Sequence, residues 1–420
     1  MPNLRKLIIS EDDDDGVAFA FAKFLIVNQG VTLSNAGTAL DTVNDRAGVE
    51  MDIKGTLLAV EGPGAEPGIG ILTAGDDAIV HLFSTGRIDG EDIGISATGD
   101  NLHLILEASS KVTVQGTGID YAGSGGRLDI DGRIIGLQTG AATTRGIEIQ
   151  LADAEIVVDI TGLIRADRGV TARNDGGRIL NSGRIEATEE GVDLFGNEAR
   201  FVNKASGVVT APASFGDDGR QFFINRGEFN GDIFLGDDGD FFDGRGGKLH
   251  GRVFGEDGDD IYVVDNAATD IREDFEEGAA DTVNSSVSYV LGDNIEQLLL
   301  IGKKNIKAVG NSDNNRLGGN DGNNRLNGKG GIDFLEGGKG RDVFVFQDLG
   351  GVDTVLDFEN GKDRFDLSGV SGIDSFNDIK AFISQDGDDV RIDLDTFSSG
   401  LSILVATIRA GKIDATDFEF

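Results

Sequence analysis

Residues Gly319–Val345 read GNDGNNRLNGKGGIDFLEGGKGRDVFV, which is three consecutive blocks of nine residues. In each block, glycines and an Asp or Asn recur within the first six positions, and a bulky apolar residue stands next to last. A looser block of the same length begins at Gly310. Because glycine adopts backbone conformations closed to other residues, each block predicts a tight turn followed by a short strand. The repeat therefore predicts a chain that coils turn upon turn.

In such a coil two blocks make one full turn, so each residue should stack on the equivalent residue two blocks further along the chain. The sixth residues of the blocks should then pair as Asn315 with Asp333 on one edge, and as Asn324 with Asp342 on the other. The residues expected to point into a core are Leu317, Leu326, Leu335 and Phe344. This regular apolar spacing argues against a flexible glycine-rich linker.

Stacked turns of this kind offer backbone carbonyls together with one or two side-chain oxygens. An adaptable, all-oxygen cage suits Ca²⁺ better than the smaller, strictly octahedral Mg²⁺. Without a cation, carboxylates and carbonyl dipoles would face each other unscreened, and the turns should open. The sequence therefore predicts several bound Ca²⁺ ions whose binding free energy is also folding free energy.

The block GGKGRDVFV at 337–345 matches residue for residue the consensus of the RTX (hemolysin-type) calcium-binding repeats. The block GEDGDDIYV at 255–263 fits with Glu256 in place of the second glycine. Asn315 and Asn324 stand where the consensus has Asp, so we expect sites that join Asn to Asp to be weaker than all-Asp sites. The expected metal ligands are Gly255, Asp257, Asp260, Asn315, Gly319, Asp321, Asn324, Gly328, Gly330, Asp333, Gly337, Lys339 and Asp342.

The resemblance extends beyond the repeats. Residues 262–302 look like the segment that commonly precedes such repeats in exported bacterial proteins, and residues 342–368 resemble the C-terminal domain shared with serralysin-type proteases. The resemblance covers about residues 230–420, and the zinc helix of the proteases has no counterpart in this sequence. It implies a Gram-negative bacterial source and export through the type I secretion machinery, with an uncleaved signal in Asp417–Phe420.

Charge and composition agree with an extracellular calcium-binding protein. The formal net charge is −37, which should repel nucleic acid and anionic membranes. The chain has no cysteine, so calcium would take the place of disulfides as the staple of an exported fold. No apolar run reaches membrane length, and residues 1–27 form neither a convincing signal peptide nor a membrane span.

The first half of the chain repeats more loosely. A unit of glycine, any residue and then Ile, Val or Phe recurs at 86–88, 132–134, 162–164, 183–185, 207–209 and 227–229. Its last four starts are nearly evenly spaced, and the spacing suits one turn of a parallel β-helix. A β-sandwich stays open as an alternative at this point.

These patterns together predict an all-β chain, in which a right-handed parallel β-helix or β-solenoid precedes a calcium-bound RTX β-roll. The expected divisions are an N-terminal segment at 1–45, a β-helix-like domain at 46–235, an RTX region at 236–345 with a strand-rich insert at 264–309, and a C-terminal β domain at 346–420 that carries the secretion signal.

The role of the first half is left open between three classes: a non-catalytic surface, matrix or adhesion protein, a polysaccharide lyase or uronan epimerase, and a cell-lytic toxin. The favoured class is the first, with a polysaccharide or a cell surface as its extracellular partner. A lyase or epimerase needs an acid, a base and a neutraliser of the sugar carboxylate on one face. The residues considered for these roles are Asp120, Tyr121, Arg127, Asp129, Arg145, Arg165, Asp167, Arg168 and Arg173. Tryptophan is absent and tyrosine is scarce, which argues against a sugar-cleaving cleft.

Overall fold

The computed structural model describes residues 6–9, 17–18, 24–36, 38–41, 49–60, 68–137, 143–150, 153–173, 175–216, 219–274, 278, 280–348, 351–408 and 410–420. It is almost entirely β-structure, built of short, mostly parallel strands. The chain divides into two compact units. The first unit consists of Met1–Asp238 and Gly246–Arg252, and the second consists of Gly239–Arg245 and Val253–Phe420.

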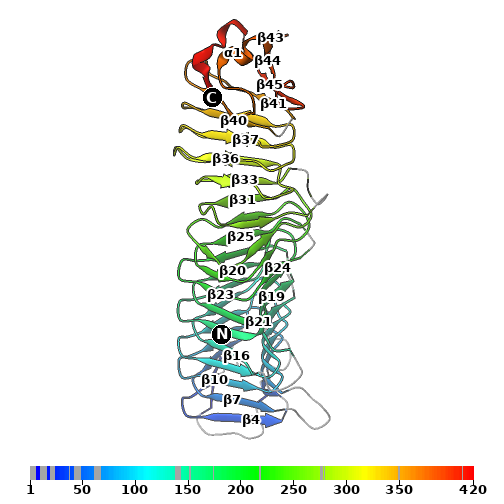
Figure 1. Cartoon of the computed structure of the whole chain (residues 1–420). Coiled ribbons are helices and arrows are strands. Elements are labelled where there is room, and N and C mark those ends of the chain that lie inside the picture. Colours follow the sequence, from blue (N-terminus) through cyan, green and yellow to red (C-terminus); the bar gives the residue numbers. More distant parts are fainter. Residues whose placement is uncertain are drawn as a thin grey trace, which may run out of the picture. The chain divides into compact units, whose positions relative to one another are not determined.

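The first unit is a parallel β-solenoid in which strands from successive turns lie above one another, as β4, β7, β10 and β16 do in Figure 1. One of its sheets contains β1 (Lys6–Ile9), β3 (Phe24–Val27), β6 (Glu50–Ile53), β9 (Ile79–Leu82), β12 (His103–Leu106), β15 (Arg127–Ile130), β18 (Glu155–Val158), β20 (Arg178–Asn181), β22 (Arg200–Asn203) and β25 (Phe222–Asn225).

A second sheet of this unit contains β2 (Val17–Ala18), β4 (Thr32–Ala36), β5 (Thr38–Asp41), β7 (Thr56–Val60), β8 (Ile69–Thr73), β10 (Arg87–Gly90), β11 (Ile93–Ala97), β13 (Lys111–Val114), β14 (Thr117–Tyr121), β16 (Arg133–Gly136), β17 (Arg145–Ile149), β19 (Leu163–Arg173), β21 (Arg184–Phe195), β23 (Val208–Thr210), β24 (Ala213–Phe215), β26 (Glu228–Asn230), β27 (Ile233–Phe234) and β29 (Lys248–Leu249). The strand β30 (Arg252–Phe254) contains the division between the two units.

The Gly-x-apolar repeat explains this stacking. The apolar residue of each unit pairs with that of the next turn, as Ile164 does with Ile185 and Ile185 with Val209. These side chains are buried because every second residue of a strand points into the interior. The predicted parallel solenoid is confirmed. The alternative of a β-sandwich is wrong, since sandwiches are built of antiparallel sheets.

An asparagine ladder lies inside the first unit. Asn181 Nδ2 donates to Asn203 Oδ1 at 2.9 Å, and Asn203 Nδ2 donates to Asn225 Oδ1 at 2.9 Å. All three side chains are fully buried. Each amide thus satisfies the amide of the next turn in an interior where an unpaired polar group would be costly.

The second unit is also largely a parallel solenoid, with β31, β33, β37 and β40 stacked in Figure 1. One of its sheets contains β28 (Phe241–Asp243), β31 (Ile261–Val264), β33 (Thr282–Ser285), β35 (Gln297–Leu300), β37 (Arg316–Gly318), β39 (Phe334–Glu336), β41 (Gly351–Val355), β43 (Ile383–Asp386), β44 (Asp389–Asp393) and β45 (Leu401–Val405). Another contains β34 (Tyr289–Val290), β36 (Lys307–Val309), β38 (Arg325–Asn327), β40 (Val343–Gln347), β42 (Arg364–Gly369) and β46 (Phe418–Glu419). The remaining elements are β32 (Asp270–Arg272), α1 (Phe376–Ile379) and the 3₁₀ helices η1 (Lys380–Phe382), η2 (Ala410–Lys412) and η3 (Ala415–Asp417).

The nine-residue blocks form this coil in the expected register. Leu317 pairs with Leu335 and Leu326 pairs with Phe344, each two blocks apart, and all four side chains are fully buried. Residues 264–309 supply β32–β36, and β33 and β35 continue the sheet of the repeats. Strands β43, β44 and β45 form an antiparallel meander, and β45 also pairs in parallel with β41. Among the described residues, no helix is long and apolar enough to span a membrane.

Candidate metal centre

Stacked turns bring the sixth residues of the blocks together at two edges of the second unit. The backbone N–H of Asn315 donates to Asp333 Oδ1 at 2.8 Å, and that of Asn324 donates to Asp342 Oδ1 at 2.7 Å. All four residues are buried. Each carboxylate therefore uses one oxygen to hold the turn before it, and its second oxygen is left for another partner.

The same contact continues beyond the blocks. The backbone N–H of Asp333 donates to Asp353 Oδ1 at 3.0 Å, and that of Asp342 donates to Asp363 Oδ1 at 2.9 Å. Sequence reasoning missed Asp353 and Asp363 because their separation from these partners does not fit the nine-residue period. The signal that marks them is an Asp followed, two residues later, by the buried Val355 or Phe365 of the next strand.

Toward the N-terminal side, the N–H groups of Asp240, Asp260 and Asp281 donate in the same way to the next turn. The side chains stacked in this way form a row of six acidic residues and one asparagine, which we call the carboxylate ladder. In chain order its members are Asp240, Asp260, Asp281, Glu296, Asn315, Asp333 and Asp353.

Within the nine-residue blocks at 310–345, two side-chain oxygens have no hydrogen-bond partner among the described residues. They are Asp333 Oδ2 and Asp342 Oδ2, and both are buried. Burial raises the pKa of each carboxyl group to about 7. A buried carboxylate oxygen without a donor is strongly unfavourable unless a cation compensates it.

The asparagines of the same rows are satisfied by the protein itself. Asn315 Oδ1 accepts from the N–H of Asn311 at 2.8 Å, and its Nδ2 donates to the carbonyl of Ile295 at 3.0 Å. Asn324 Oδ1 likewise accepts from the N–H of Asn320 at 2.7 Å. These amides therefore act first as structural bridges between turns.

Glycines let the oxygens approach this closely. A Cβ atom added to Gly328 would lie 1.8 Å from Asp333 Oδ2, and one added to Gly337 would lie 2.8 Å from Asp342 Oδ2. A Cβ on Gly319 would lie 2.1 Å from the carbonyl oxygen of Gly337. Any larger residue would occupy the space beside these oxygens, so the expected glycines line an oxygen-rich cradle.

A second group of oxygens lies around Gly255. One carboxylate oxygen each of Asp260, Glu273 and Asp281 lies within 4.8 Å of the others, and we call this group the acidic triad. The hydroxyl of Tyr262 lies 3.1 Å from Asp260 Oδ2 and also bonds Glu273 Oε1. Sequence reasoning found Gly255 and Asp260 but missed Glu273 and Asp281, which lie outside the nine-residue block.

Burial dominates the electrostatics of the acidic triad. It raises the pKa of Glu273 to about 9, that of Asp260 to about 7 and that of Asp281 to about 6, and the neighbouring carboxylates add to each shift. A Cβ on Gly255 would lie 2.4 Å from both Asp260 Oδ2 and Glu273 Oε1. Two of the three buried acids, together with the Tyr262 hydroxyl, therefore converge on a position that only glycine leaves open.

Other expected ligands lie at or near the surface. Asp257 is exposed, and Asp321 forms an exposed ion pair with Lys339 at 3.1 Å. Gly330 is half-buried. What these residues could offer a metal is a backbone carbonyl oxygen, and that role stays a prediction.

The donor set fits Ca²⁺. It consists of carboxylate and carbonyl oxygens, it includes buried anionic oxygens that lack a donor within the described protein, and it contains no nitrogen or sulfur ligand. Hard oxygen donors in adaptable number favour Ca²⁺ over softer metals. Asp333, Asp342 and the acidic triad are the residues that would hold the ions.

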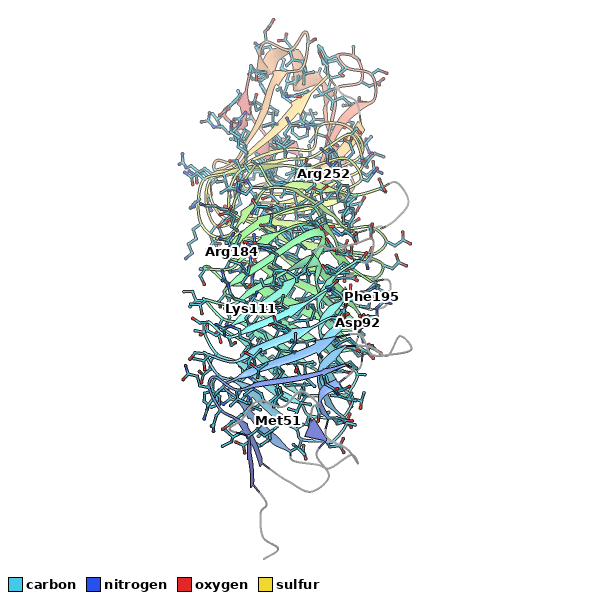
Figure 2. The ribbon with its side chains drawn as sticks, turned by 90° about the horizontal axis from the view of Figure 1, so that it is seen from below. Met51, Asp92, Lys111, Arg184, Phe195 and Arg252 are labelled. Atoms are coloured by element: carbon cyan, nitrogen blue, oxygen red, sulfur yellow. The ribbon has the colours of Figure 1, made fainter. Side chains whose placement is uncertain are left out.

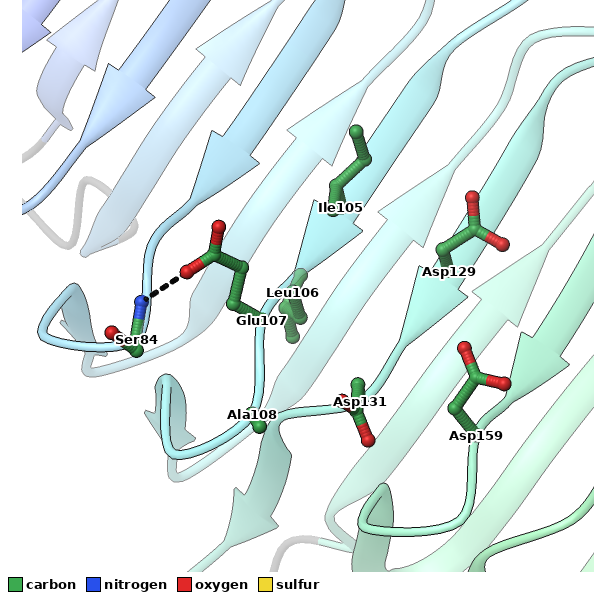
Figure 3. Close-up of a pocket in the computed structure, with 8 residues that line it drawn as sticks. All are labelled: Ser84, Ile105, Leu106, Glu107, Ala108, Asp129, Asp131 and Asp159. Carbon is green, nitrogen blue, oxygen red and sulfur yellow. Dashed lines mark hydrogen bonds between the residues drawn. The ribbon is translucent and has the colours of Figure 1, made fainter.

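The first unit contains an acidic pocket of about 380 Å³ (Figure 3). Three of its four carboxylates, those of Glu107, Asp129 and Asp131, already have partners: Glu107 Oε2 accepts from the N–H of Ser84 at 2.9 Å, and Asp129 Oδ2 lies 3.2 Å from His103. Asp131 accepts from the N–H of Thr161 at 3.2 Å. We assign this pocket no ligand.

The residues considered for sugar chemistry are divided between two sheets of the first unit. Arg127 and Asp129 belong to β15, whereas the other candidates belong to the neighbouring strands β14, β17 and β19 of the other sheet, where Arg145 pairs with Arg168. Tyr121 is fully buried, and its hydroxyl donates to the carbonyl of Ser124 at 2.9 Å. A buried, hydrogen-bonded tyrosine is placed as a core residue.

Residues 202–418 match the family described as the peptidase M10 serralysin C-terminal domain, over just over half of the chain. The chain belongs to this family. The expected resemblance to the serralysin-type C-terminal domain is thus confirmed, and it begins within the first unit. No curated protein sequence matches the chain. Among solved structures, the extracellular lipase LipA from Serratia marcescens is similar over 53% of this chain at 13% identity, with a TM-score of 0.22, and the match spans 40% of the length of LipA.

Proposed function

We propose that this member of the serralysin C-terminal family is a secreted calcium-binding protein whose second unit completes its folding when Ca²⁺ binds. The observation that carries the proposal is the pair of buried oxygens, Asp333 Oδ2 and Asp342 Oδ2, that have no hydrogen-bond donor among the described residues. They lie on stacked turns whose glycines leave space beside them. A divalent cation would supply the missing positive charge.

Bound Ca²⁺ would neutralise the carboxylates and so stabilise the folded second unit. In its absence the buried acids must either stay protonated or repel one another, and both outcomes weaken the packing of turn on turn. The acidic triad adds a further candidate position for an ion. The number of ions bound would follow from how many of these positions are filled.

This chemistry supports export in an unfolded state. Extracellular-type calcium sites bind at roughly 10⁻⁴–10⁻³ M, far above the calcium level of a cytosol. The second unit would stay loose inside the cell, pass through the type I secretion machinery and fold outside. The chain has no cysteine, so calcium binding would do for this unit what disulfides do for many secreted domains.

For the first unit we propose a non-catalytic role at a surface or in an extracellular matrix. Support comes from the core position of Tyr121, whose buried hydroxyl donates to the carbonyl of Ser124 instead of lying on an outer face. A stacked solenoid presents long, regular faces that suit binding.

The test is chelation followed by limited proteolysis. Treatment with EDTA should reduce the far-UV β signal and open cleavage sites within 253–420, and added Ca²⁺ should restore both. The solenoid at 68–216 serves as the internal control and should resist the protease in both states. Mg²⁺ at the same concentration should not restore protection. Unchanged cleavage of 253–420 in EDTA would refute the proposal.

A further inference from the structure

A column of cations lies on the outer face of the first unit. Arg87 pairs with Lys111 in the parallel ladder, and Lys111 pairs with Arg133. The residues that follow them in sequence are fully buried apolar side chains, so these three point outward. We call them the cationic column. Arg87 and Arg133 are the middle residues of the Gly-x-apolar units at 86–88 and 132–134. Lys111 lies on the turn between these two units.

The stacking places three like charges about 4.8 Å apart, which is unfavourable without a partner. Among the described residues, no carboxylate oxygen forms an ion pair with Lys111 or Arg133, and Arg87 donates only to the carbonyls of Ser84 and Gly86. Elsewhere on this sheet, Arg184 forms an ion pair with Glu186 at 2.5 Å. In a chain with a net charge of −37, an unneutralised column of this kind is a local exception.

A groove of about 350 Å³ runs beside the cationic column, along the C-terminal ends of the same strands. It is lined in part by Leu58, Asp89, Glu91, Thr113, Gln115 and Leu137. Leu58 and Leu137 are 39% and 40% exposed, which is high for leucine. The side chain of Thr113 is buried, and its hydroxyl has no hydrogen-bond partner among the described residues.

We propose that this face of the first unit binds a linear carboxylated polysaccharide that runs along the stack of strands. Its carboxylates meet Arg87, Lys111 and Arg133, because charge-assisted hydrogen bonds to carboxylate are the strongest contacts that these groups make. Its sugar rings lie in the groove, where Leu58 and Leu137 contact the apolar ring faces. Such a ligand gives a chemical class to the surface role proposed for the first unit, on which it rests, and it does not depend on calcium binding by the second.

The polar side chains that line the groove suit the hydroxyl groups of such a polymer. Asp89 and Glu91 accept hydrogen bonds from sugar hydroxyls. The same two carboxylates, together with the net charge of the chain, disfavour a denser polyanion such as nucleic acid or polyphosphate. Figure 2 shows Lys111 and Arg184 on the same side of the strand stack, so a variant of each tests the same face.

The test is a binding titration of the full Ca²⁺-loaded chain with an oligomer of galacturonic acid, with a neutral dextran oligomer and with polyphosphate. The unchanged protein should bind the uronate, and its affinity should fall as salt is added. The double variant Lys111→Ala/Arg133→Ala should bind it roughly a hundredfold more weakly, about tenfold for each lost charged contact.

Of two further variants, one controls for the loss of a positive charge on this face, and the other tests the groove by itself. Arg184→Ala, whose guanidinium is already paired with Glu186, should leave the affinity unchanged. Leu137→Ala removes one exposed apolar contact of the groove and should weaken binding severalfold. Equal uronate binding by the double variant would overturn the proposal, and so would binding of dextran or polyphosphate as tight as that of the uronate.

Discussion

At the scale of single residues, the two oxygens of Asp342 have different tasks. Oδ1 accepts the N–H of Asn324 at 2.7 Å, while Oδ2 is buried without a donor among the described residues. Asn315, at the matching position of another turn, has its amide oxygen and nitrogen engaged by Asn311 and Ile295. The charge needed for a cation therefore comes from the aspartate.

This contrast ranks the two residues as calcium ligands. Asp342→Ala should lower calcium affinity tenfold or more, on the order of 2 kcal/mol, because it removes a buried anionic ligand. Asn315→Ala should lower it less, since the side chain carries no charge. Calorimetric titration of each variant with Ca²⁺ gives the comparison. Equal losses of affinity would contradict the ranking.

Substitution of Gly328 tests whether the Asp333 carboxylate needs the open space beside it. A Cβ atom at this position would lie 1.8 Å from Asp333 Oδ2, so Gly328→Ala must displace the carboxylate. We expect a loss of about 1–3 kcal/mol in the stability of the calcium-loaded second unit, measured by denaturant unfolding. Gly411→Ala is the matched control, because a Cβ there meets nothing within 4 Å. A similar, small effect of both substitutions would show that the cradle is not tight.

At the scale of elements, the asparagine ladder and the carboxylate ladder solve the same packing problem differently. In the first unit, neutral amides bond one another from turn to turn and need no ion. In the second unit, Asp333 and Asp342 each accept a backbone N–H with one carboxylate oxygen, and the other oxygen lacks a donor within the described protein. The first unit should therefore be stable without calcium, and the second should not.

Asn203 is the central member of the asparagine ladder. Asn203→Ala removes the short hydrogen bond of Asn181 Nδ2 and that of Asn225 Oδ1, and we expect about 1–3 kcal/mol of lost stability in the first unit. Asn230→Ala provides the control, because its side chain is half-buried and makes only long hydrogen bonds, of 3.3 and 3.4 Å. Thermal unfolding with and without calcium should show the same loss for Asn203→Ala. A loss below about 1 kcal/mol would mean that water replaces the missing amide.

The pH dependence of the second unit follows from its buried acids. Burial raises the folded-state pKa of Asp333 and Asp342 to about 7 and that of Glu273 to about 9. A carboxyl group with a raised folded-state pKa favours folding below its ordinary pKa, and this contribution is lost as pH rises through the folded value. In EDTA, the second unit should therefore melt at a higher temperature at pH 5 than at pH 8.

Calcium should reverse that slope, because it binds the ionised carboxylates and competes with protons. The measurement is a series of thermal melts between pH 5 and pH 8, with EDTA and with Ca²⁺, followed by a probe of the second unit. A flat profile in EDTA would mean that the carboxyl groups are not buried in the metal-free state.

At the scale of the whole molecule, periodicity predicted much of the fold. The register of Leu317 with Leu335 follows from glycine turns and one inward apolar residue per block, and both are visible in the sequence. The looser repeat of the first unit also placed its apolar residues correctly, because they recur beside a glycine. Where the repeat is regular, residue spacing alone predicts which apolar side chains point into the core.

The candidate metal centre was less accessible to sequence reasoning. Glu273, Asp281, Asp353 and Asp363 lie outside the nine-residue period, and only the three-dimensional register brings them to the stacked turns. The cationic column was hidden for a similar reason. Arg87 and Arg133 stand in the Gly-x-apolar repeat, but Lys111 follows a serine, so only the register of the strands shows that the three residues stack.

The central claim is that ions between glycine turns hold the second unit together, while the first unit is held by its apolar core and its amides. Differential scanning calorimetry of the intact chain tests this directly. With Ca²⁺, the account predicts a high-temperature transition assigned to the second unit, which disappears or falls steeply in EDTA while the transition of the first unit stays in place. An EDTA-stripped sample with the same melting profile as the calcium-loaded one would contradict the account.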